Sequence, residues 1–294
     1  MKLYKTTFSP TSNFATTLKG DTLFGQICWA IRYTFGKDKL EELLLDYESN
    51  PFLIVSDGFA QGYLPKPSIP SHLLGENIDL KKENRKKIWL TIEELQNADF
   101  LKARKDEEIN YEKKSSSIVK NSLNYKTFTT DDNGKFSPYS EEEYSFSPKD
   151  VYFLINEEKF SLDDLNKTIK TLSLIGYGKN SSIGKGFFEF CDFKDVSITS
   201  QSKIFMLLSP AVLSNQNFKD SYYEPFTRFG KHGAGLNANP FKKPILMANT
   251  AGVVIFENNF YKPYIGNAIK GHSSIENTVH QGYSIIIPIK DLNI

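Results

Sequence analysis

The sequence predicts an α+β protein made of two modules, of which the second is a degenerate copy of the first. Up to about residue 195, with insertions set aside, the hydrophobic patterns follow the order strand, helix, strand, strand, helix, strand. That order belongs to the split βαβ, or ferredoxin-like, fold. After residue 200 strand patterns dominate and helix signals are weak. We therefore expect one domain over residues 1–195 and a second, mostly β domain over residues 196–294.

The first module begins with a strand and a largely buried helix. Residues 2–8 alternate roughly between apolar and polar side chains, as expected of a strand. A helix with a broad apolar face starts at Gly20, with Asp21 as its predicted N-cap, and ends at Gly36. A shorter helix follows, and the apolar residues 52–55 predict the next strand.

A polar insertion at about residues 110–147 interrupts this module, after a short helix expected over 91–98. Its composition favours a β-hairpin with arms at 118–129 and 135–146, joined by a turn at Asp132-Asn133-Gly134. Because long polar insertions within a domain are uncommon, we expect this one to be either disordered or functional.

The module closes with a strand, a helix and a final strand. Residues 151–155 predict the strand, and Ser161 opens the helix, with Asp164 three residues later as in a capping box. Gly176 is placed to end that helix, and residues 187–190 predict the last strand. Three strands are expected in the second module, at residues 204–208, 253–256 and 283–287.

The charge balance excludes one class of nucleic-acid binder. The chain carries 36 basic and 35 acidic side chains, a net charge of +1, so it is not a uniformly basic polyelectrolyte. Any nucleic-acid contact must be a local patch. Residues 1–200 carry 27 basic and 30 acidic side chains, whereas residues 201–294 carry 9 and 5. The aromatic content of 14% fits either a packed core or a surface on which bases stack.

Several classes of protein lack their signatures in this chain. Cys28 and Cys191 lie far apart, which excludes a disulfide scaffold and a thiolate zinc site. The four histidines form no HExxH motif, and no GxSxG elbow occurs, so the residues predict no metal or cofactor site. Runs of Val, Leu and Ile, such as residues 285–287, are at most three residues long, and the first residues lack a signal-peptide pattern. We therefore expect a cytoplasmic protein without membrane contact.

The segment 176–186 is the strongest candidate for a binding site. Closely spaced glycines let a backbone approach a ligand, and their N–H groups can form an anion-binding nest, while lysines and serines add donors for phosphate. The candidate residues are Gly176, Gly178, Lys179, Asn180, Ser181, Ser182, Gly184, Lys185 and Gly186. The spacing and the helix-then-strand order differ from a Walker A loop, which disfavours a nucleotide hydrolase. A ligand-free turn is the alternative.

A second basic segment spans residues 228–243. It combines basic, glycine and phenylalanine residues and contains no acid, a composition typical of single-stranded RNA contacts. Its candidate residues are Arg228, Lys231, His232, Lys242 and Lys243. One alternative is an exposed loop that merely connects two strands. Another is that His232 acts as a general base in RNA cleavage.

These residues resemble the RAMP superfamily of CRISPR proteins, whose modules are ferredoxin-like (RRM-like) and carry a glycine-rich loop between the second helix and the last strand. The loop 176–186, followed by two phenylalanines, matches that pattern. Lys19-Gly-Asp-Thr-Leu-Phe-Gly25 resembles the opening of the first helix in these proteins, and Lys120-Asn-Ser-Leu-Asn124 resembles the start of their thumb hairpin. Tyr125-Lys126 stands where an Arg would be expected.

Within the superfamily the chain resembles the Csm-complex subunit that caps the crRNA 5′ end in type III-A effectors. The stretches Tyr63-Leu-Pro-Lys-Pro67, Asn239-Pro-Phe-Lys-Lys-Pro244 and His280-Gln-Gly-Tyr283 carry this resemblance, which runs from residue 2 to about 289. It implies a non-catalytic subunit that grips the crRNA 5′ tag. Such a subunit bridges the large polymerase-like subunit to the backbone RAMP subunits, and its thumb contacts the guide–target RNA duplex.

The same resemblance implies where these contacts lie in this chain. It assigns tag binding to the glycine-rich loop and to the helix opening at Lys19, Gly20 and Asp21. It assigns the thumb to about 110–147, with Lys120 and Asn121 among the RNA contacts. The basic loop 228–243 is an addition based on its composition.

Two other functions stay open at this point. A crRNA-processing RAMP endoribonuclease typically has its glycine-rich loop near the C-terminus and an early catalytic histidine. Here more than 100 residues follow the loop and no histidine precedes His72, which disfavours that function. A scaffold that contacts only protein would suit the polar insertion and the aromatic content, but it would not need lysines in the glycine-rich loop.

Overall fold

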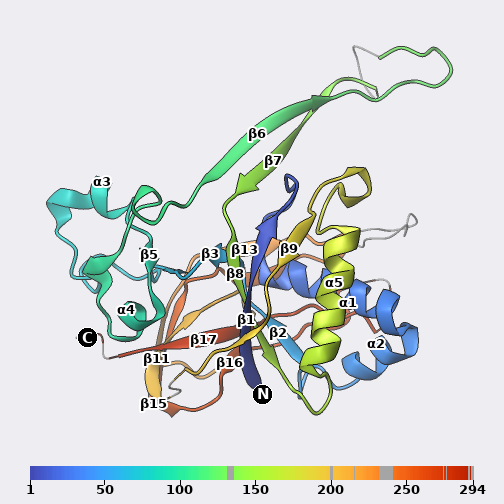
Figure 1. Ribbon diagram of the computed structural model, residues 1–294. Helices are drawn as coiled ribbons and strands as arrows, with labels where there is room; N and C mark the ends of the chain where they lie inside the picture. The colour runs from blue at the N-terminus through green and yellow to red at the C-terminus, as the bar shows by residue number, and fades with distance from the viewer. Residues whose placement is uncertain are drawn as a thin grey trace.

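The chain folds into antiparallel sheets with helices packed mainly against the first of them (Figure 1). The computed structural model describes residues 1–130, 136–198, 201–214, 216–231, 241–273, 275, 277–290 and 292. This arrangement confirms the mixed α and β class expected from the sequence. No helix among these residues combines the length and the apolar character needed to cross a membrane.

The first sheet is antiparallel and is built around β1 and β8. Its order is β10-β1-β8-β2, with β9 also paired to β1 and β3 to β8, and all these pairs are antiparallel. Helices α1 and α5 pack side by side, and α2 follows α1 (Figure 1). The strands are β1 (Lys2–Pro10), β2 (Leu53–Val55), β3 (Phe59–Ala60), β8 (Lys149–Ile155), β9 (Phe188–Phe190) and β10 (Lys194–Asp195). The helices are α1 (Gly20–Phe35), α2 (Lys37–Leu44) and α5 (Leu162–Ile175).

The second half of the chain forms a five-stranded antiparallel sheet of order β12-β15-β11-β17-β16, and a separate hairpin of β13 and β14. Its described residues contain no helix. The predicted strands at 204–208, 253–256 and 283–287 correspond to β11, β15 and β17, and the shorter strands went unpredicted. The bounds are β11 (Ser202–Leu207), β12 (Asp220–Tyr222), β13 (Pro225–Arg228), β14 (Ile245–Ala248), β15 (Val253–Phe260), β16 (Tyr264–Gly266) and β17 (Tyr283–Ile289).

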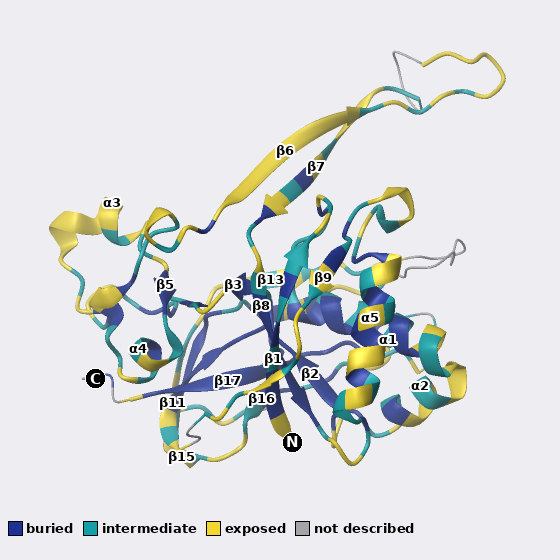
Figure 2. Cartoon of the chain, in the orientation of Figure 1, coloured by how far each residue is buried: buried dark blue, intermediate teal, exposed yellow. Residues whose placement is uncertain are grey.

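An insertion between β3 and β8 forms a small lobe and a long hairpin that projects from the body (Figure 1). The predicted helix over 91–98 is α4, and Thr91 and Glu94 form its capping box. The lobe contains β4 (Leu64–Pro65), β5 (Trp89–Leu90), α3 (Lys81–Asn84), α4 (Ile92–Gln96) and 3-10 turns at Ile78–Leu80, Phe100–Lys102 and Glu107–Ile109. The hairpin consists of β6 (Lys113–Lys120) and β7 (Tyr139–Phe146), and β6 is exposed along most of its length (Figure 2).

The first arm of this hairpin was predicted wrongly. It spans Lys113–Lys120 rather than 118–129, and Lys113 pairs with Phe146 while Lys120 pairs with Tyr139. The base of the hairpin sets this register, because Phe14 and Tyr144 pair through their backbones and the Phe14 and Phe146 rings pack together. The predicted turn residues Asp132-Asn133-Gly134 lie outside the described residues.

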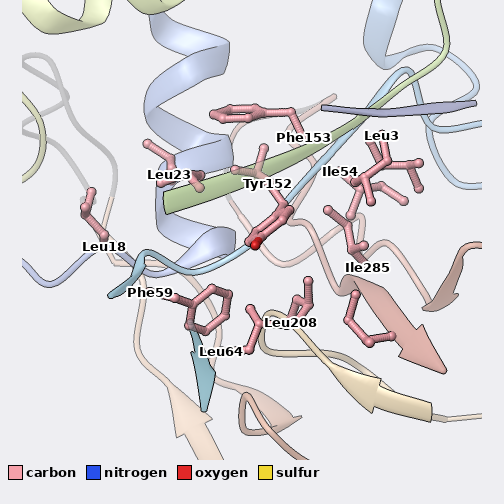
Figure 3. Packing of buried hydrophobic residues seen from close by; sticks show 14 of the residues in the cluster. Leu3, Leu18, Leu23, Ile54, Phe59, Leu64, Tyr152, Phe153, Leu208 and Ile285 are labelled. Carbon is pink, nitrogen blue, oxygen red and sulfur yellow. The ribbon is translucent and has the colours of Figure 1, made fainter. Parts of the chain in front are cut away.

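The main hydrophobic core draws side chains from both halves of the chain. Figure 3 shows Tyr152 of β8 on the same side of that strand as Leu208, which follows β11, and Ile285 of β17, and all three belong to one cluster. Two smaller clusters occupy the second half. The core therefore continues across the domain boundary expected at residue 195.

Candidate nucleic-acid interface

The glycine-rich loop connects α5 to β9 and narrows to a tight neck. The amide of Tyr177 donates to the carbonyl oxygen of Gly186 at 2.8 Å, which brings the two sides of the neck together. Gly186 has φ +77°, and a Cβ there would lie 2.0 Å from the Tyr177 carbonyl oxygen. Gly184, at the exposed tip, also has a positive φ, but a Cβ there would meet nothing within 4 Å. At the neck, glycine is therefore required because a Cβ would clash with the facing backbone. At the tip, glycine is favoured because φ is positive.

The segment after β1 supports this loop. The Lys179 amide donates to Thr16 Oγ1 at 3.0 Å, and the Gly186 amide donates to the Asn13 carbonyl oxygen at 2.9 Å. The buried Tyr177 hydroxyl donates to the Thr17 carbonyl oxygen at 2.9 Å. The loop is thus anchored to the residues that lead directly into α1. Ser181 is half-buried and Ser182 is exposed.

Three predicted RNA contacts from two separate motifs meet at Glu141 of β7. Lys120 Nζ lies 2.5 Å from Glu141 Oε2, and Lys179 Nζ lies 2.5 Å from Glu141 Oε1. Asn180 Nδ2 donates to Glu141 Oε2 at 2.7 Å. These hydrogen bonds, first that from Lys120, lower the pKa of Glu141 to about 2. The carboxylate therefore stays ionised at neutral pH.

Glu143 holds the second lysine of the loop. Lys185 Nζ lies 2.6 Å from Glu143 Oε2, and Asn13 Nδ2 donates to the same oxygen at 3.1 Å. The Glu143 side chain is only 1% exposed, and the hydrogen bond from Lys185 lowers its pKa. Glu142 points to the other face of the strand, where it accepts from the Tyr144 hydroxyl at 2.7 Å. Neither Glu141 nor Glu143 was predicted from the sequence, although their spacing of two places them on one face of any strand.

The opening of α1 is bound to a carboxylate rather than open to solvent. Asp57 Oδ1 accepts from the Gly20 amide at 2.7 Å, and Asp57 Oδ2 accepts from Lys19 Nζ at 2.8 Å. Thr250, from the second half of the chain, donates to the same Oδ2 at 2.6 Å. A Cβ on Gly20 would lie 2.4 Å from the Val55 carbonyl oxygen. Asp57 thus caps the helix from a distant segment, and the predicted N-cap role of Asp21 is wrong: the N-cap is Lys19.

Asp21 is instead a fully buried carboxylate that forms an ion pair across the two halves of the chain with the partly exposed Arg228. Arg228 binds it with two hydrogen bonds, from Nε at 2.6 Å and from Nη2 at 2.9 Å, and the Asp21 side chain is 0% exposed. His280 Nε2 lies 3.5 Å from Asp21 Oδ2. Burial, together with Lys242 and Arg228, lowers the pKa of His280 to about 3, so this histidine is neutral above that pH.

The two ends of the basic loop, which follow β13 and precede β14 in the sequence, lie next to each other. Lys231 and Phe241 form a bridge, and the Lys231 ammonium lies 4.8 Å from the centre of the Phe241 ring. The Lys242 amide donates to the Gly230 carbonyl oxygen at 2.9 Å, and burial lowers the pKa of the Lys242 ammonium. Lys243 is exposed and contacts the Gly271 carbonyl oxygen at 3.2 Å. The segment does connect two strands, and His232 lies outside the described residues.

Most of the predicted RNA contacts around the loop and the start of α1 thus fall into two groups. The segment before α1 connects these groups. Lys120, Lys179, Asn180 and Lys185 lie where the loop meets the hairpin, whereas Lys19, Asp21 and Arg228 lie where the two halves of the chain meet. Asn121 is exposed at the end of the first group. No group of three His, Cys, Asp or Glu side chains in the described part of the chain could hold a metal ion.

Comparison with known families identifies the class of protein that this fold and this loop define. The sequence profile of the RAMP superfamily matches residues 11–189, and the chain therefore belongs to that superfamily. This span contains α1, the hairpin and the glycine-rich loop. No curated protein sequence matches the chain.

Solved structures similar to this chain include chains of two type III-A subcomplexes. A chain of the Csm1–Csm4 cassette in complex with cA4 matches with a TM-score of 0.63 and 20% identity, over 99% of this chain and 98% of that chain. The cassette in complex with AMPPNP gives 0.60 and 19% at the same coverage. The Csm3–Csm4 subcomplex of the type III-A CRISPR–Cas interference complex gives 0.60 and 16%, over 99% and 100%. At these identities the likeness establishes the fold.

Proposed function

We propose that this chain is the Csm4-type subunit of a type III-A CRISPR interference complex, and that it holds the 5′ tag of the crRNA without catalysing a reaction. The observation that carries this proposal is the match over 99% of the chain to structures of two different subcomplexes. Csm4 is the component that the two have in common. The partners follow from the same comparison: a large polymerase-like subunit of the Csm1 type and a backbone RAMP subunit of the Csm3 type.

The contacts at the loop support an RNA-binding role. A phosphate backbone is bound by lysine ammonium groups, amides and hydroxyls, and the loop presents Lys179, Asn180 and Ser182 together. Lys120 of the hairpin adds a fourth donor beside them. These groups form a small basic site on a chain of net charge +1.

We propose further that the β6–β7 hairpin is the thumb and that the chain contains two ferredoxin-like modules. The hairpin projects from the body (Figure 2). The segment beyond β6 presents Tyr125 and Phe128, which are 86% and 78% exposed. Exposed aromatic rings suit contact with unstacked bases of a guide–target duplex. In the second half, the sheet built around β11, β15 and β17 would be the degenerate module.

The non-catalytic assignment has support from His280. A general acid or base for RNA cleavage works best with a pKa near the operating pH and within reach of the substrate. His280 is buried, and its pKa of about 3 keeps it neutral in that range.

Purification of the assembled complex tests this function. The tagged chain would be expressed with the other subunits of its complex, purified under mild conditions, and its bound RNA sequenced from the 5′ end. We expect a large subunit, backbone subunits and RNAs that share one 5′ sequence. Proteins without RNA would support a scaffold instead. Cleavage of repeat RNA by the purified chain, abolished by His232→Ala, would support the endoribonuclease.

A further inference from the structure

The three donors around Glu141 come from two parts of the chain that lie far apart in the sequence. Lys120 ends strand β6, whereas Lys179 and Asn180 belong to the loop after α5, yet all three lie 2.5 to 2.7 Å from one carboxylate. We propose that Glu141 is an internal anion that occupies a phosphate position formed by Lys120, Lys179 and Asn180, and that an RNA phosphate binds there by displacing it. This inference rests on the proposed function, since it names how the RNA enters that site.

The chemistry of the two anions is interchangeable at this position. Carboxylate and phosphate oxygens both accept charge-assisted hydrogen bonds from lysine, and both accept from amide N–H groups. Three donors directed at one carboxylate therefore form a ready site for a phosphate oxygen.

Solvent can reach this site without movement of the loop backbone. The Lys179 side chain is 59% exposed, and the adjoining tip at residues 182–184 is exposed as well. A phosphate can approach Lys179 from solvent while Glu141 rotates away. The strand that carries Glu141 stays in place, because the neighbouring Tyr144 is paired with Phe14 through two backbone hydrogen bonds of 2.9 and 2.7 Å.

Glu143, two residues away, has a different role. Its side chain is 1% exposed, compared with 10% for Glu141, and its partner Lys185 is 22% exposed. Displacing Glu143 would leave a charge buried without its partner, which is strongly unfavourable. We therefore assign Glu143 to anchoring the loop against the hairpin, and Glu141 alone to exchange with phosphate.

The exchange predicts how the site responds to the loss of the carboxylate. Lys120, Lys179 and Glu141 together carry a charge of +1, and removal of the Glu141 charge raises it to +2. An incoming phosphate then no longer competes with an internal anion. We expect Glu141→Gln to bind RNA roughly tenfold more tightly, because the free energy of one charge-assisted hydrogen bond corresponds to about that ratio of affinities. The slope of the log binding constant against the log salt concentration should steepen by about 0.7, which is the change expected for one further phosphate contact.

The test uses the full chain, two ligands and three variants. Binding of a crRNA 5′-tag oligonucleotide and of inorganic tripolyphosphate would be titrated at several salt concentrations for wild type, Glu141→Gln, Glu142→Gln and Glu143→Gln. Glu142→Gln is the matched control, because Glu142 lies on the opposite face of the same strand and its carboxylate accepts from the Tyr144 hydroxyl. Melting temperatures would accompany each titration. Glu141→Ala repeats the test without an amide in place of the carboxylate.

We expect both Glu141 variants to bind tripolyphosphate and tag RNA more tightly than wild type, and Glu142→Gln to match wild type. Glu143→Gln should melt at a lower temperature without binding more tightly. Unchanged or weaker tripolyphosphate binding by folded Glu141 variants would overturn the exchange, whatever the RNA result. Tighter tripolyphosphate binding without any binding of tag RNA would leave the exchange standing and refute the proposed function instead.

Discussion

Substitution of the neck glycine, Gly186→Ala, tests whether the loop is built as described. The new Cβ would lie 2.0 Å from the Tyr177 carbonyl oxygen, whereas ordinary contact begins at 3.4 Å. The neck must open, which breaks the hydrogen bond between the Tyr177 amide and Gly186 and the one between the Gly186 amide and Asn13. Tyr177 is fully buried, so its ring is disturbed as well.

The magnitude follows from two contributions. A positive φ costs an alanine about 1–2 kcal/mol. Loss of two hydrogen bonds adds about 2 kcal/mol, at roughly 1 kcal/mol each. Gly184→Ala is the matched control, because Gly184 has φ +91° but open space around its Cβ position. We therefore expect Gly186→Ala to lower the free energy of unfolding by about 3–4 kcal/mol, and Gly184→Ala by only the first contribution.

Chemical denaturation of the two variants measures this difference directly. RNA titration adds a functional readout, because opening the neck moves Lys179 and Lys185 away from the positions in which β7 holds them. We expect weaker binding by Gly186→Ala and nearly unchanged binding by Gly184→Ala. Equal stability of the two variants would refute the packing argument, since strain alone would then account for both.

Three further predictions concern the lysines of the loop and the contact between the two halves. Lys179→Ala with Lys185→Ala should weaken tag RNA binding and flatten the log–log salt slope by about 0.7, one single-strand phosphate contact, because Lys185 is held by the buried Glu143. The control is the pair Lys167→Ala and Lys170→Ala on α5. An equal effect of this pair on RNA binding would exclude the loop from the binding site. Asp21→Asn should lower the free energy of unfolding by about 3 kcal/mol, because Arg228 loses a buried charged partner. Arg228→Lys should lower it by less. Unfolding free energy should also fall as the pH drops below 6.5, by about 2 kcal/mol at pH 5, because unfolded His280 is protonated there while the folded histidine, with a pKa of about 3, is not. In His280→Asn this share of the pH dependence should vanish.

Local signals in the sequence predicted the elements that local interactions decide. Gly36 and Gly176 end their helices with positive φ, and Ser161 accepts the Asp164 amide at 3.1 Å, as expected of such residues. The first arm of the hairpin was misplaced because serines and lysines carry no strand pattern of their own. That arm is a strand because β7 pairs with it, and β7 is set in register by its contacts with Phe14.

The same difference between local and distant interactions decides which residues of the candidate site could be predicted. The lysines and glycines could be found because their spacing within a short segment carries the signal. Glu141 could not be assigned to them, since its partners lie 21 and 38 residues away and only the folded hairpin brings them together. Asp57 was missed for the same reason, because it caps α1 from 37 residues further along the chain.

The near-neutral charge of the chain takes on a specific meaning once these pairs are known. Lys19, Lys120, Lys179, Lys185 and Arg228 each have an acidic partner within 2.9 Å. A count of charges therefore cannot separate a cation that binds RNA from one that holds the fold together. What separates them is the cost of removing the acid: low where the lysine is open to solvent, as at Lys179, and high where the acid is buried, as at Asp21. By this criterion Lys179, where the loop meets the hairpin, is the candidate for RNA binding, and Arg228 serves the contact between the two halves.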